Sequence, residues 1–61
     1  MERLFTVKEL SDIINVREST IYAWVSQERI PHIKLGKKVL FDPSEIEKWV
    51  KEHRRSPAKY N

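Results

Sequence analysis

The chain has 61 residues, no cysteine and a formal net charge of +3. At this length we expect one small domain that buries only about 60% of its unfolded surface, with no disulfide or thiolate metal site to reinforce it. His32 and His53 have no obvious companion ligands, so we expect neither a metal nor another cofactor. The sequence has no apolar run long enough to cross a bilayer and no signal peptide, which favours a cytoplasmic protein without membrane contact.

The positive charge is unevenly placed along the chain. Residues 29–41 contain four basic residues and no acid, and Arg54, Arg55 and Lys59 form a second basic group. This distribution suits a polyanion better than a small substrate. We do not expect an enzyme, because the chain has no nucleophile–base pair, phosphate-binding loop or metal cluster, and little room for a substrate pocket.

The first predicted element is a helix that begins at Thr6 and stops near Asn15, after a short apolar lead-in at Leu4-Phe5 that suits an edge strand. Thr6 and Glu9 have the spacing of a capping box. Asn15 tolerates the left-handed conformation that ends many helices. An apolar stripe recurs at helical spacing and comprises Val7, Leu10 and Ile14, widened by Ile13.

A second helix is predicted at about residues 18–27, and it should end before Ile30-Pro31 because a residue that precedes proline disfavours the helical conformation. Its buried stripe consists of Ile21, Trp24 and Val25. Arg17 stands where a capping side chain is expected, which leaves Ser19 or water to cap the helix. The other side chains lie on or near the outside: Arg17, Ser19, Thr20, Tyr22, Ala23, Ser26 and Gln27.

Residues 32–41 alternate around Gly36, which predicts a β-hairpin. A two-residue turn at Gly36-Lys37 suits glycine in the first central position, but it divides the apolar residues between two faces. A three-residue connection over residues 36–38 places four of them on one buried face: Ile33, Leu35, Val39 and Phe41. We predict this second register, because a slip of one residue would move the whole apolar set to solvent. Lys37 and Lys38 then lie at the exposed tip.

A third helix begins at Asp42-Pro43-Ser44-Glu45, which supplies an acidic N-cap, proline at the first position and glutamate at the third. It is predicted to run to about His53 or Arg54, with Ile46, Trp49 and Val50 on its buried face. We expect one domain over residues 1–55 and a flexible basic tail over residues 56–61. The expected core is Leu10, Ile14, Ile21, Trp24, Val25, Ile33, Leu35, Phe41, Ile46 and Trp49.

These elements predict a small α+β domain, mostly α-helical, in which a helix-turn-helix is followed by a β-hairpin wing. The second helix of such a unit reads base edges in the major groove of DNA. Arg17 is either a contact to guanine or a solvated surface residue, and Thr20 either contacts DNA or packs. Lys37 and Lys38 suit phosphates better than a purely solubilising role. The predicted DNA-binding residues are Arg17, Ser19, Thr20, Tyr22, Ala23, Ser26, Gln27, Lys34, Lys37 and Lys38.

Several segments, in this order, resemble the excisionase family of MerR-like winged-helix DNA-binding domains: Phe5–Leu10, Val16–Trp24, Ile30-Pro31, Leu35–Lys38 and Phe41–Trp49. The resemblance covers about residues 4–52. It implies a recognition helix at about residues 18–27 and a wing at residues 33–41. It also implies a small protein of a phage or mobile element that bends DNA to bias an integrase towards excision, or a local transcription regulator.

Two residues depart from the pattern of that family. Arg17 stands where serine or threonine is usual, and Glu28 stands where glycine usually ends the recognition helix. Glu28 therefore predicts a less sharply terminated helix and places an acid near the DNA.

The implied partners are double-stranded DNA and an integrase or other recombinase. Tandem or dimeric binding is expected, because a single module covers only about 600–1,000 Å². A protein-interaction module on a recombinase is the alternative that does not require DNA.

Overall fold

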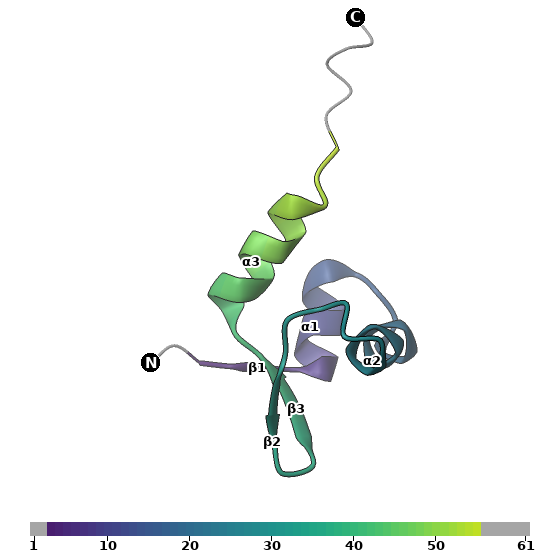
Figure 1. Ribbon diagram of the computed structural model, residues 1–61, viewed down its shortest axis with the longest axis vertical. Coiled ribbons are helices and arrows are strands. Elements are labelled where there is room, and N and C mark those ends of the chain that lie inside the picture. The colour runs from purple at the N-terminus through teal and green to yellow at the C-terminus, as the bar shows by residue number, and fades with distance from the viewer. Residues whose placement is uncertain (1–2, 56–61) are drawn as a thin grey trace, which may run out of the picture.

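The computed structural model describes residues 3–55. In chain order the elements are β1 (Phe5–Thr6), α1 (Val7–Ile14), α2 (Glu18–Ser26), β2 (Ile33–Leu35), β3 (Lys38–Phe41) and α3 (Pro43–Glu52) (Figure 1). Three helices with a small antiparallel sheet confirm the predicted fold class. The predicted tail at residues 56–61 lies outside the described residues. None of the helices within residues 3–55 has the length and apolar character that crossing a membrane requires.

α1 begins and ends at the predicted residues. The Glu9 N–H donates to Thr6 Oγ1 over 3.1 Å and the Thr6 N–H donates to Glu9 Oε1 over 2.9 Å, which completes the capping box. The Arg3 guanidinium also pairs with Glu9, and the hydrogen bond from Thr6 is the main cause that lowers the pKa of the Glu9 carboxyl. Asn15 ends the helix in the left-handed conformation, with φ of 59°.

α2 begins at Glu18, as predicted, but its capping and its termination differ from the expectation. No side chain caps the helix, so Ser19 does not take the capping role that Arg17 leaves open, and the Thr20 N–H donates to the Arg17 carbonyl over 3.0 Å. At the other end, Glu28 has φ of 58°, the conformation that glycine usually supplies. The helix is therefore sharply terminated, contrary to the prediction from Glu28.

The hairpin register predicted from the apolar pattern is wrong. The sheet has the order β1-β3-β2, and β2 pairs with β3 through Ile33–Leu40, Lys34–Val39 and Leu35–Lys38. Gly36 and Lys37 therefore form a two-residue turn, in which Gly36 has φ of 63°. This is the turn whose twist matches that of the flanking strands. The apolar residues are divided between two faces as a result, and Leu35 is 57% exposed instead of buried.

The core lies between the helices and one face of the sheet. Its buried residues are Val7, Leu10, Ile21, Val25, Ile30, Phe41 and Ile46, with Ile14, Val16, Trp24 and Trp49 partly buried against them. Ile30 was not expected there. Ile13 and Val50 were expected on buried faces but are 57% and 45% exposed, because each lies beside the line of its helix that the neighbouring elements cover.

α3 is joined to the end of α2 by an aromatic contact. The helix starts at its predicted cap, where the Ser44 N–H and hydroxyl donate to Asp42 Oδ1 over 2.9 and 2.8 Å. These bonds lower the pKa of the Asp42 carboxyl. Trp49 donates from its indole Nε1 to the Arg29 carbonyl over 2.9 Å, and its ring lies 5.5 Å from that of Trp24. This contact places the end of α2 relative to α3.

Candidate nucleic-acid interface

A groove of about 330 Å³ separates the hairpin from α2 and the start of α1. Its polar lining comes from four elements and the turn between strands: Thr6 from β1, Lys8 from α1, Glu18 and Tyr22 from α2, Lys37 from the turn and Lys38 from β3. The structure thus brings Tyr22 together with Lys37 and Lys38, three of the residues predicted from the sequence. It adds Lys8 and Glu18, which the sequence analysis did not single out.

The exposed surface of α2 continues from this groove. A helix turns by about 100° per residue, so Ser19, Ala23 and Ser26 follow Tyr22 round its outer face, and all of them are exposed. Their side chains are small or absent. Another backbone or a base edge can therefore approach this face of the helix closely.

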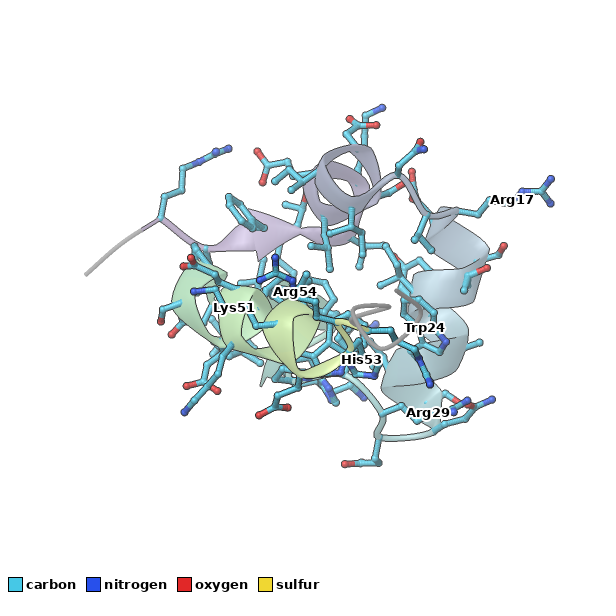
Figure 2. The ribbon with its side chains drawn as sticks, turned by 90° about the horizontal axis from the view of Figure 1, so that it is seen from above. Arg17, Trp24, Arg29, Lys51, His53 and Arg54 are labelled. Carbon is cyan, nitrogen blue, oxygen red and sulfur yellow. The ribbon has the colours of Figure 1, made fainter. Side chains whose placement is uncertain are left out.

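The remaining predicted residues of α2 lie on another side. Thr20 and Gln27 fall in line with Trp24 at helical spacing. Thr20 is half-buried, while Gln27 accepts a hydrogen bond from Arg29 Nη1 over 3.2 Å at its Oε1. Arg17 projects outward from the start of α2 (Figure 2) but does not line the groove. The predicted surface is thus divided, with Tyr22 on the groove side and Arg17, Thr20 and Gln27 away from it.

Two further residues extend the hairpin side of the interface. Lys34 lies on β2 opposite Val39, is exposed, and does not line the groove. Leu35 lies opposite Lys38 next to the turn. An apolar side chain therefore accompanies the lysines at the exposed end of the hairpin.

The groove carries more positive than negative charge. Three lysines, Lys8, Lys37 and Lys38, line the groove together with one acid, Glu18. Glu18 lies in the first turn of α2, where its negative charge interacts favourably with the positive end of the helix dipole. The ion pairs found within residues 3–55 are Arg3–Glu9 and Lys51–Glu47, so none of them occupies these lysines. Their ammonium groups are donors without a fixed acceptor, which is the chemistry that a phosphodiester requires.

Lys8 and Glu18 could have been found from the sequence only in part. Glu18 precedes Tyr22 by four residues, the spacing of side chains on one face of a helix. Lys8 lies on α1, and only the antiparallel pairing of β1 with β3 brings the start of α1 beside the hairpin.

These features define a class of small domain in which a helix pair is followed by a short sheet and a basic groove lies between the second helix and the hairpin. The helix-turn-helix domain family matches residues 4–54, and the chain belongs to this family. Comparisons with curated proteins and with solved structures gave no match. Helix-turn-helix domains are DNA-binding units, so DNA is the partner that this membership implies.

Proposed function

We propose that the chain binds double-stranded DNA with α2 in the major groove and the hairpin turn against the neighbouring phosphates. The observation that carries this proposal is the groove itself, where lysines from α1 and the hairpin lie beside Tyr22 and the exposed face of α2. An α-helix fits the width of the major groove. The small side chains of Ser19, Ala23 and Ser26 permit a close approach to the bases.

The proposed contacts fall into two kinds. Lys8, Lys37 and Lys38 bind phosphates, together with the Tyr22 hydroxyl, and carry affinity without sequence preference. Arg17, Ser19 and Ser26 contact base edges or phosphates near α2, and Arg17 has the fork of donors that guanine accepts. Ala23 lies among them and leaves room for the bases, while Thr20, Gln27 and Lys34 lie at the margins of this surface.

The biological role that we propose is that of an excisionase-type architectural protein, which bends DNA and biases a recombinase towards excision. It is supported by the ordered resemblance over about residues 4–52, by the small size of the domain and by its helix-turn-helix membership. A local transcription regulator would use the same surface. A reconstituted excision reaction separates the two roles, since a regulator leaves the yield of excision unchanged.

DNA binding is tested through its dependence on salt, with duplexes selected from a random pool. If about five phosphates are neutralised, log K should fall against log salt with a slope of about −4 to −5. Lys37→Ala combined with Lys38→Ala should make the slope less steep by about 2 and weaken binding to all sequences alike. Arg17→Ala should instead change the preference among sequences.

Lys48→Ala provides the control, because Lys48 is exposed on α3 and does not line the groove. It should leave both the slope and the preference close to those of the unmodified chain. A response to salt that is flat for every duplex would refute DNA binding and favour a protein-interaction module. If the two lysine substitutions changed the preference among sequences while Arg17→Ala weakened binding to all sequences alike, the roles proposed for the helix and the hairpin would be reversed.

A further inference from the structure

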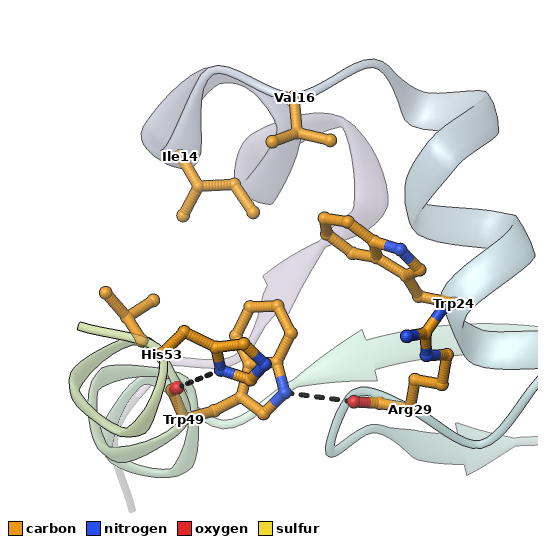
Figure 3. Close-up of a pocket in the computed structure, with 7 residues that line it drawn as sticks. Ile14, Val16, Trp24, Arg29, Trp49 and His53 are labelled. Atoms are coloured by element: carbon orange, nitrogen blue, oxygen red, sulfur yellow. Dashed lines mark hydrogen bonds between the residues drawn. The ribbon is translucent and has the colours of Figure 1, made fainter. Parts of the chain in front are cut away.

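A second hollow, of about 350 Å³, is lined by residues of α1, α2 and α3 and of the segments that follow them. These three helices lie on the side of the molecule away from the hairpin turn (Figure 1). Apolar and aromatic side chains form most of the wall of the hollow: Ile14, Val16, Trp24, Trp49 and Val50. Figure 3 shows Trp24 reaching from α2 towards Trp49 on α3, beside which lies His53, the residue that follows α3. The size of the hollow is at the lower end of the range for ligand pockets in proteins.

The wall of this hollow is held by hydrogen bonds and ring contacts. The Trp49 indole donates to the Arg29 carbonyl over 2.9 Å, and His53 Nδ1 lies 2.8 Å from the Trp49 carbonyl oxygen (Figure 3). The ring centroids of Trp49 and His53 are 4.5 Å apart. The site is therefore formed before any ligand arrives, which lowers the entropic cost of binding.

The apolar surface extends beyond this hollow along the seam between α1 and α3. Ile14 and Val50 also line a neighbouring hollow, together with Ile13 and Ile46. Ile13 and Val50 are 57% and 45% exposed. Single exposed apolar residues are ordinary, whereas here several of them lie together along one seam.

The charges beside the Trp24–Trp49 hollow are positive. Arg29 and His53 are the only lining residues with ionisable side chains, and no acid lines it within the described part of the chain. Arg54 lies on the same side of the molecule (Figure 2). A second copy of this chain would bring the same arginines to the contact, so an acidic partner is favoured over self-association.

This hollow and the DNA-binding groove use different sides of α2. Tyr22 lines the groove and Trp24 lines the hollow. Two residues along a helix correspond to a rotation of about 200°. The two sites can therefore be occupied at the same time.

We propose that the Trp24–Trp49 hollow docks an acidic segment of a protein partner that carries one large apolar side chain. That side chain enters between the two tryptophans, as an anchor residue enters a pocket at an interface. Carboxylates on either side of it pair with Arg29 and Arg54. The domain then holds DNA with one side and a protein with the other, a function additional to the proposed DNA binding.

The test uses the full chain labelled with ¹⁵N and a synthetic peptide in which one phenylalanine is flanked by glutamates and aspartates. Both tryptophan indole N–H signals should shift on titration. The same peptide with alanine in place of phenylalanine should bind at least about tenfold more weakly, because burial of the ring is lost. If the two peptides bind equally, or if neither indole signal moves, the proposal is refuted.

Variants of the chain separate the apolar contact from charge attraction. Arg29→Glu should weaken peptide binding about tenfold or more, and Lys48→Glu, with the same change in charge on the other side of α3, should not. The fold tolerates Arg29→Glu because the side chain bonds only to exposed Gln27, while Trp49 bonds to the backbone. Val50→Lys should also weaken binding although it adds a cation, and tighter binding would refute an apolar site.

The same titration on a preformed DNA complex distinguishes this site from the DNA-binding groove. The indole signals should shift while the DNA stays bound. Displacement of DNA, with shifts confined to Lys8, Lys37 and Lys38, would show that the acidic peptide uses the groove instead and would overturn the proposal. Failure of the chain to bind DNA in the first place, with retained indole shifts from the peptide, would count against the proposed function alone.

Discussion

Glu28→Gly should stabilise the domain, because Glu28 occupies a position that disfavours every residue with a Cβ. Its φ is 58°. Its N–H donates to the Val25 carbonyl over 3.0 Å, and the next N–H, from Arg29, donates to the Trp24 carbonyl over 2.9 Å. This pair of bonds is the Schellman arrangement, in which the left-handed residue is most often glycine.

The expected gain follows from two opposing terms. The left-handed conformation costs an ordinary residue about 1–2 kcal/mol, and glycine avoids this cost. Glycine also makes the unfolded chain more flexible, which lowers the free energy of unfolding by about 0.4–1 kcal/mol. The net stabilisation is about 0.5–1 kcal/mol. In a domain of this size, Tm should rise by about 2–8 °C. Far-UV circular dichroism during thermal unfolding measures it.

Glu28→Gln is the matched control, because glutamine keeps the Cβ and the length of the side chain but removes the charge. Its Tm should stay close to that of the unmodified chain, and Glu28→Asn should fall between glutamine and glycine because asparagine tolerates this conformation. If glutamine raises Tm as much as glycine does, the gain is electrostatic and the reasoning from backbone strain is wrong. A lower Tm for glycine would also refute it.

Two other variants test the joint between helices and the response to acid. Trp49→Phe should lower the free energy of unfolding by about 1–2 kcal/mol, since it removes the hydrogen bond to the Arg29 carbonyl and part of the ring packing. Urea unfolding followed by the fluorescence of Trp24 measures this loss. A loss below about 0.5 kcal/mol would mean that the hydrogen bond contributes little. Asp42 has a lowered pKa in the folded state, against a usual value of 3.8, so its contribution to stability is present above that value and is lost as the pH falls through its folded pKa. Asparagine is also a good N-cap, but its side chain does not titrate. On acidification, the Tm of the Asp42→Asn variant should therefore fall less than the Tm of the unmodified chain. Equal losses of Tm in both chains would contradict a stabilising role of the Asp42 carboxylate.

The helix starts in α1 and α3 were predictable because the groups that make them are close in sequence. Thr6 and Glu9 cap each other within one turn, and Asp42 bonds to Ser44 two residues later. Asn15 likewise ends α1 with its own backbone conformation. Signals of this kind require no knowledge of the rest of the molecule. The helix-turn-helix class and its implied partner followed from such elements in order.

Burial and hairpin register were not predictable from the pattern alone. The alternation around Gly36 favoured a three-residue connection, yet the turn geometry of glycine prevailed and left Leu35 in solvent. Ile13 and Val50 also match apolar stripes, but α1 and α3 are each covered along a narrower line than their sequences indicate. The hydrophobicity of a residue indicates how much free energy its burial would contribute. It does not indicate whether another element of the fold covers that residue.

By itself the sequence determined where α1 and α3 begin, where α1 ends, and which class of domain the elements form, because those features depend on contacts within a few residues. Only the tertiary structure decided that Lys8 and Glu18 join Tyr22 and the hairpin lysines at one groove, while Trp24 turns to another site with Trp49. It also decided that Glu28 takes the place of a glycine. These outcomes depend on how β1, the hairpin and α3 pack around α2, and such packing joins residues that are far apart in the chain.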